Sequence, residues 1–204
     1  GYQQLNGQLT GHSSYSDKTK VANIEFTLKA QHAADMHVDT KTVYPTGASL
    51  APLYNFITTG KMPASNTALK ALHFTYIDHG LIAHIATAMG QLEDKKSIQE
   101  EEDWSETLRH KANQAVQPKI KTALMVLSNF MHNPTTLMIS LTPAKPVPLH
   151  KLKQAQLNFI NHRNADEIVL SKKAQARVDA IKRVHYEKLI VKWMDTLGFA
   201  LRVK

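Results

Sequence analysis

Apolar residues stand at every second position in three short segments near the start of the chain, at residues 5–9, 22–28 and 36–42. Successive side chains of a β-strand point to opposite sides of a sheet, so this spacing is typical of strands with one buried and one wet face. Polar segments at residues 14–20 and 30–35 separate the three and predict turns. The pattern predicts an antiparallel β-meander over residues 1–45.

Within residues 69–90 the apolar spacing changes from that of a strand to that of a helix. Leu72, Phe74 and Tyr76 alternate as strand residues do. Asp78 follows, and its carboxylate is suited to accept hydrogen bonds from the free N–H groups of a first helical turn. Gly90 is placed to end the helix. The expected buried stripe of this helix comprises Leu81, Ile82, Ile85, Ala86 and Met89.

The remaining chain predicts more helices and two more strands. Helical spacing is found over residues 48–57, 104–131, 149–161 and 171–197, whereas residues 136–141 and 199–203 alternate. Pro118 is expected to kink or split the second of these helices. The acidic run at residues 100–103 favours a helix start, where negative charge meets the positive end of the dipole. The expected inward residues of the last helix are Ala174, Val178, Ile181, Leu189, Ile190, Trp193, Met194 and Leu197.

These elements predict an α+β fold, in which a mainly antiparallel sheet is covered on one face by several helices. A chain of 204 residues with 43% hydrophobic residues can bury one substantial core. We therefore expect a single domain over residues 1–204. It comprises the N-terminal meander at 1–45, a strand–helix core at 69–160 and a basic C-terminal helix at 171–198.

Missing residue types narrow the range of functions. The chain has no cysteine, which excludes disulfides, thiol nucleophiles and zinc sites built on thiolates. No apolar run approaches the ~20 residues of a membrane-spanning helix, and no segment has the pattern of a signal peptide. Because the chain begins at Gly1 rather than at a methionine, removal of an export signal or anchor before residue 1 is compatible with this sequence.

Positive charge is concentrated near the C-terminus. Residues 1–144 contain 12 Lys+Arg and 12 Asp+Glu, whereas residues 145–204 contain 13 and 5. The last helix could therefore present a basic face to phosphates of nucleic acid or of acidic lipid head groups. The simpler interpretation, which we favour, is a solvated amphipathic helix, because three acidic residues interrupt the charge. The basic candidates are Lys172, Lys173, Arg177, Lys182, Arg183, Lys188 and Lys192.

An apolar stripe in the long central helix offers a second candidate site. Its residues could line a lipid pocket between helix and sheet, although such stripes are more often plain core. The pocket candidates are Leu124, Leu127, Phe130 and Met131.

Catalytic and metal motifs are weak. Asp35, His37 and Asp39 share one strand face, but no second ligand pair completes a metal site, so solvated surface is the favoured interpretation. His79 and His84 are five residues apart and do not match the zinc-protease spacing. No G-x-S-x-G, G-x-x-x-x-G-K or G-x-G-x-x-G motif occurs. The sequence predicts no enzyme, no metal and no cofactor.

Two segments, LKALHFTYIDHGLIAHIATAMG and NPTTLMISLTPAKPVPLHKL, carry a resemblance to a known pattern. A strand ends in an Asp-X-Gly-Leu turn before helices, and a second strand ends in a proline-rich turn. Together they resemble a bacterial periplasmic protein family of unknown function, and the resemblance implies an exported, non-catalytic envelope protein. The matching residues are Asp78, Gly80, Leu81, Asn133, Pro134, Leu137, Ile139, Leu141, Pro143, Pro146 and Pro148.

The leading functional hypothesis is a non-enzymatic, extracytoplasmic envelope protein that binds an apolar ligand or a protein partner. The alternative is a binder of anionic surfaces through the basic C-terminal helix, with acidic lipid or, less favoured, nucleic acid as the partner.

Overall fold

In a computed structural model of the chain, the structure describes residues 6–44, 67–92, 97–152 and 172–204. Seven strands form one antiparallel sheet, in the order β1-β2-β3-β4-β5-β7, and the short β6 pairs with β4 beyond this path. The C-terminal strand thus belongs to the same sheet as the N-terminal meander. The strands are β1 (Gly7–Ser16), β2 (Val21–Ala30), β3 (Ala34–Val43), β4 (Ala68–Asp78), β5 (Thr136–Leu141), β6 (Val147–Pro148) and β7 (Phe199–Val203).

The predicted meander is present, but its first turn is shorter than expected. β1 runs on to Ser16, opposite Val21, so the turn contains only residues 17–20 rather than 14–20. Lys20 has a left-handed backbone angle, φ 56°, and closes the loop, where Tyr44 N–H also bonds to its carbonyl at 2.8 Å. Serine is compatible with an edge strand, and pairing with β2 overrides its turn preference.

Strand register gives the sheet an apolar face and a polar face. One cross-strand row on the apolar face runs Leu9, Leu28, Met36, Tyr76, Leu137 and Val203. The next row, on the opposite face, runs Thr10, Thr27, His37, Thr75, Met138 and Arg202. The alternation in the sequence therefore corresponds to a sheet with one apolar face, which can pack in a core, and one polar face.

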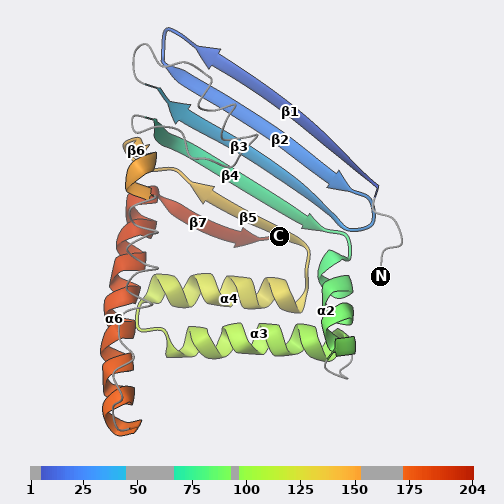
Figure 1. Ribbon diagram of the computed structural model, residues 1–204, viewed down its shortest axis with the longest axis vertical. Helices are drawn as coiled ribbons and strands as arrows, with labels where there is room; N and C mark the ends of the chain where they lie inside the picture. Colours follow the sequence, from blue (N-terminus) through green and yellow to red (C-terminus); the bar gives the residue numbers. More distant parts are fainter. Residues whose placement is uncertain (1–5, 45–66, 93–96, 153–171) are drawn as a thin grey trace.

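Helices cover the apolar face over part of the sheet, which confirms the α+β class. α3 and α4 form a helical hairpin that lies side by side below β7 in Figure 1, while α2 and α6 stand at its two ends. The ring of Phe130 in α4 packs edge-on against Tyr76 of β4, with centroids 5.8 Å apart. The bounds of the described helices are α2 (Leu81–Leu92), α3 (Ser97–Gln114), α4 (Pro118–His132) and α6 (Lys172–Leu197).

Pro118 splits the predicted long helix, since α3 ends at Gln114 and α4 begins at Pro118. Other expectations are wrong. Ile85 and Met89, expected in the buried stripe of α2, are 42% and 40% exposed, because this part of the helix lies beyond the core that Leu81 and Ile82 contact. Gly90 does not end α2, which continues to Leu92 with Gly90 buried inside it. Ile181 does not point into the core but is 71% exposed. The helix predicted at residues 48–57 and most of that at 149–161 lie outside the described residues.

Asp78 links the central strand to α2, as predicted. Its Oδ2 accepts a hydrogen bond from Gly80 N–H at 2.8 Å, and its Oδ1 accepts one from Ile82 N–H at 3.2 Å. The hydroxyl of Tyr76 donates to the same Oδ1 at 2.6 Å. Gly80 has φ 107°, a conformation that favours glycine and lets the chain turn sharply from strand to helix. One carboxylate therefore fixes the strand end, the turn and the helix start.

Glu187 caps α4 from a distant part of the sequence. Its Oε2 accepts hydrogen bonds from Val116 N–H and Gln117 N–H, both at 2.7 Å. The side chain of Gln117, the N-cap residue, makes no capping bond, and Pro118 has no N–H to satisfy. Glu187 is only 6% exposed. The acidic residue that interrupts the basic face of α6 in the sequence thus has a structural role at the positive end of another helix.

Replacing Asp78 by alanine should lower the free energy of unfolding by about 1–2 kcal/mol, because three donors lose their acceptor. Urea denaturation followed by circular dichroism measures this. Asp17→Ala is the matched control, since Asp17 is an exposed aspartate that pairs only with Lys20 in the β1–β2 turn; it should change stability by less than about 0.5 kcal/mol. Equal midpoints for the two variants would contradict the capping role.

Glu187→Ala should destabilise the fold by about 2–3 kcal/mol, because two charge-assisted bonds at a helix N-terminus are lost. Glu187→Gln keeps an acceptor oxygen and should cost about 1 kcal/mol. Asp195→Ala provides the control on the same helix, since it breaks only the exposed ion pair with Lys119 and should cost below about 1 kcal/mol. Thermal and urea unfolding should rank the variants in this order; a neutral Glu187→Ala would refute the cap.

Candidate functional site

The apolar face of the sheet is covered at one side and open at the other. Towards β4, β5 and β7, a core forms around the buried Ala34, Tyr76 and Phe130. Towards the β1 edge, Phe26 is 41% exposed and Leu9 is 71% exposed. Register places both on the same face as Tyr76, because Leu9 and Leu28 continue its row and Phe26 lies two residues from Leu28. The open part is therefore an extension of the core surface that the described helices leave uncovered.

α2 carries two further exposed apolar side chains. Its first residues, Leu81 and Ile82, pack against the core on the apolar face. Further along the helix, Ile85 is 42% exposed and Met89 is 40% exposed. Residues three and four positions apart share a helix face, so Ile82, Ile85 and Met89 form one stripe that begins in the core and ends in solvent. We name Leu9, Phe26, Ile85 and Met89 the open apolar surface.

The same face is closed at the β1–β2 turn. Ala22, Ile24 and Tyr44 form a small buried cluster there. The ring of Tyr15 packs edge-on against Tyr44, with centroids 6.4 Å apart, and burial raises the pKa of the Tyr44 phenol. Along β2, solvent exposure thus begins directly after Ile24, at Phe26. The open apolar surface has a defined end on this side.

The predicted pocket residues of α4 lie in and around the core. Phe130 is buried and Met131 packs beside it, while Leu124 and Leu127 are half-buried. A cavity of about 320 Å³ does adjoin α4, between it, α6 and β7, but other residues line it. Its lining includes Ala123, Val126, Met194, Phe199 and Leu201, with Lys119 among them. None of the four residues predicted from the sequence lines this cavity.

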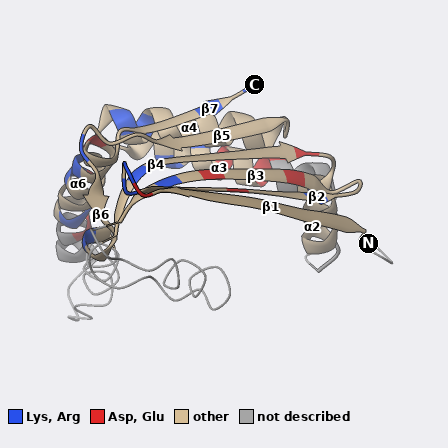
Figure 2. Cartoon of the chain, turned by 90° about the horizontal axis from the view of Figure 1, so that it is seen from above, with Lys and Arg blue, Asp and Glu red and all other residues tan. Residues whose placement is uncertain are grey.

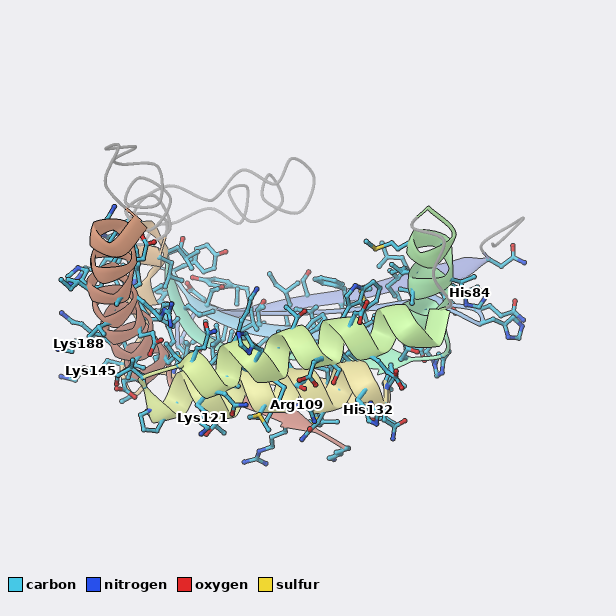
Figure 3. All side chains as sticks on the ribbon, turned by 90° about the horizontal axis from the view of Figure 1, so that it is seen from below. His84, Arg109, Lys121, His132, Lys145 and Lys188 are labelled. Atoms are coloured by element: carbon cyan, nitrogen blue, oxygen red, sulfur yellow. The ribbon has the colours of Figure 1, made fainter. Side chains whose placement is uncertain are left out.

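A second, polar cavity of about 480 Å³ lies between α3 and α4. Glu102, Glu106 and Arg109 line it from α3, and His132 from α4; Figure 3 shows Arg109 and His132 along this helical pair. Arg109 forms an ion pair with Glu106. Ser105 and Ser128 also line the cavity, and there each serine hydroxyl donates to the other residue's carbonyl, Ser105 to Ser128 at 3.0 Å and Ser128 to Ser105 at 2.8 Å.

The acidic run at residues 100–103 lies in the first two turns of α3, as the sequence predicted. On the polar face of the sheet, Asp35 lies 3.4 Å from His79 Nε2, and His37 Nδ1 lies 2.9 Å from the Thr27 hydroxyl. Within the residues that the structure describes, no group of three or more His, Asp or Glu side chains is arranged to hold a metal ion.

The basic candidates of α6 whose side chains are described do not form one face. Lys188 and Lys192 are exposed and one helical turn apart, and Figure 3 shows Lys188 pointing away from α3 and α4. Arg183 precedes Lys188 by five residues and so points to nearly the opposite side of the helix. Lys182 is half-buried. The side chains of Lys172, Lys173 and Arg177 lie outside the described part. Figure 2 nevertheless shows blue residues along α6.

Sequence reasoning missed the open apolar surface, because alternation shows which face is apolar but not how far its cover extends. One signal was available: two apolar-face positions of β1 are Gly11 and Ser13, opposite Phe26 and Ile24, and such small residues add little to a core.

No described helix is long and apolar enough to cross a membrane.

Comparisons with known proteins place the chain in a family. A family model described as "Uncharacterized protein" matches residues 16–165, which is more than half of the 204 residues and extends from the end of β1 past β6. No curated protein and no solved structure matches the chain. The chain belongs to this family of uncharacterized proteins.

Proposed function

We propose that this protein is a non-enzymatic binding protein that holds an apolar ligand against the open apolar surface. The single observation that carries the proposal is the exposure of Phe26, a large aromatic side chain in an inner strand, at 41%. Phe26 lies between β1 and β3, opposite Gly11 and Val38. The exposed part of this ring contributes little to the free energy of folding. Its burial against an apolar ligand would contribute favourably to the free energy of binding.

The composition of this surface indicates the kind of ligand. Positions on the apolar face of β1 and β2 carry no charge: they are Leu9, Gly11, Ser13, Tyr15, Ala22, Ile24, Phe26 and Leu28. No charged group is therefore available on this face of the two strands to recognise an ionic head group. Binding would depend on contact with an uncharged, elongated segment such as an acyl chain, with Ile85 and Met89 of α2 offering adaptable side chains.

The resemblance of the Asp78 and Pro134 segments to a periplasmic family supports an extracytoplasmic location for this binding protein. Acyl chains of lipids are abundant in a cell envelope, so the proposed ligand and the proposed location agree.

A second function is favoured by the exposed pair Lys188 and Lys192. They lie on one side of α6 with His185, and each is exposed. This surface could bind an anionic partner such as acidic lipid head groups. Lys119, by contrast, is already paired with Asp195.

Phe26→Gln should weaken binding of a fluorescent long-chain fatty acid about 5- to 10-fold, since roughly 1–1.4 kcal/mol of apolar contact is removed. Fluorescence titration gives the dissociation constant. Ile181→Gln is the control: Ile181 is a more exposed apolar residue, on α6, and its replacement should leave the affinity unchanged. Equal losses for both variants, or none for either, would contradict the proposed surface. Circular dichroism verifies that both variants fold.

Lys188→Glu combined with Lys192→Glu should reduce retention on vesicles containing an anionic phospholipid at least 3-fold at low salt, and the difference should vanish at high salt. A co-sedimentation assay measures the bound fraction. The matched control is Lys18→Glu with Lys121→Glu, which makes the same change of charge at exposed lysines on other elements. The second function would be excluded if the two double variants behaved alike.

A further inference from the structure

β1 is an edge strand whose outer side is open. It pairs with β2 over ten residues, Gly7 to Ser16, and among the described residues no strand pairs with its other side. Figure 1 shows β1 as the outermost strand, with the described helices grouped towards the opposite side of the sheet. All of its residues except Tyr15 are exposed. The edge is thus accessible along its whole length.

The hydrogen-bond pattern shows which backbone groups of β1 point outwards. Gln31 N–H donates to the Asn6 carbonyl at 2.9 Å, so residue 6 directs its backbone groups towards β2. Backbone direction alternates along an antiparallel strand. Even-numbered residues of β1 therefore bond to β2. The outward N–H and C=O groups belong to Gly7, Leu9, Gly11, Ser13 and Tyr15.

None of the usual devices that protect an edge strand is present in β1. Its sequence, GQLTGHSSYS, contains no lysine, no acidic residue and no proline. Its register with β2 is continuous, without a bulge. Natural proteins protect long edges with charge, proline or bulges because an open ladder of N–H and C=O groups pairs readily with another strand. β1 has the properties of an edge that is used for pairing.

We propose that β1 pairs antiparallel with β1 of a second copy of this chain, joining two sheets edge to edge. Pairing of outward groups requires that odd-numbered residues face odd-numbered residues. Two such registers are nearly centred on the strand. One places Gly11 opposite Gly11 and Leu9 opposite Ser13. The other places His12 opposite His12 and Leu9 opposite Tyr15, and we select it because each apolar side chain then contacts another.

A second copy suits this edge for two reasons. β1 carries no Asp, Glu, Lys or Arg, so pairing it with itself brings no like charges of these residues together, which would be unfavourable for directly opposed residues. A two-fold axis perpendicular to the sheet also keeps the apolar sides of both strands on the same side. In the selected register, Leu9, Gly11, Ser13 and Tyr15 of one copy bond to Tyr15, Ser13, Gly11 and Leu9 of the other, which gives about eight backbone hydrogen bonds.

This dimer would make one continuous apolar face from two open halves. Phe26 and Leu9 of each copy lie next to the joined edge, while the helix-covered cores lie at the two far ends. The pairing does not rest on the proposed ligand, because it uses backbone groups of β1, whereas the ligand would contact the side chains of Phe26, Ile85 and Met89.

The absence of native cysteine allows a direct test of both pairing and register. In the selected register, His12→Cys places two thiols opposite each other, within the Cα separation that a disulfide requires. Mild oxidation should convert most of this variant into a covalent dimer. Gln8→Cys is the control: Gln8 is exposed on the same strand and the same face, but its copy would be about 27 Å away, so it should stay monomeric. Equal cross-linking of both variants would indicate non-specific collision, and no cross-linking of His12→Cys would overturn the register.

The pairing itself is tested without cysteine by analytical ultracentrifugation of the full chain. The protein should sediment with twice the monomer mass at micromolar concentration. Ser13→Pro removes an outward N–H and places a ring on the edge, so it should restore the monomer mass. Ser13→Thr keeps the N–H and should remain a dimer. Both variants should remain folded, because the backbone groups of Ser13 do not bond to β2. Circular dichroism checks this. A monomeric wild type, or a dimer unaffected by Ser13→Pro, would overturn the proposal, whatever the affinity for fatty acid.

Discussion

The packing of α4 against β3, β4 and β5 is the interaction on which the other parts depend. Phe130 and Met131 lie on Tyr76 and Leu137 and form the largest described part of the core. α3 is attached to α4 through the Ser105–Ser128 bonds, and α6 is attached through Glu187. β7 then follows α6 and joins β5 as the last strand. Each of these elements reaches its place by contact with α4 or with the strands that α4 covers.

The same arrangement explains why part of the sheet is open. A hairpin of two helices covers the strands nearest to it, but the sheet extends outwards through β2 to β1, with strands about 4.8 Å apart. α2 begins on the covered part, at Leu81 and Ile82, and its stripe continues into solvent. The exposed side chains are thus a consequence of a sheet that is wider than the cover that the described helices provide. Both the proposed ligand surface and the proposed edge pairing lie at this uncovered side.

Much of the fold could be predicted from the sequence, because it depends on local rules. Alternation identified the meander, β4, β5 and β7, and Asp78 was recognised as a cap from its place between strand and helix. Pro118 marked the boundary between α3 and α4. The helix end predicted at Gly90 was wrong. A glycine ends a helix only where tertiary packing does not stabilise the next residues as helix, and here α2 continues in contact with α3.

The candidate site was much less predictable, because it depends on contacts between distant segments. The role of Glu187 required knowledge that α6 lies beside residues 116 and 117. To predict the exposure of Phe26, one must know which strands the helices cover. Helical spacing predicted Leu124, Leu127, Phe130 and Met131 as pocket residues, but Phe130 and Met131 lie in the core. A periodic pattern describes the face of one element, whereas a surface site depends on what its neighbours leave uncovered.

The contact between Glu187 and the start of α4 also bears on how the protein folds during synthesis. Val116 and Gln117 receive their acceptor from a residue about 70 positions later in the chain. A nascent chain that ends before α6 therefore contains an α4 whose first N–H groups are bonded only to water. β7 is synthesised later still and closes against β5. The start of α4 thus obtains its acceptor only after α6 has been synthesised, and β5 obtains its outer neighbour only after β7, so this half of the sheet depends on contacts of long sequence separation and should form late in folding.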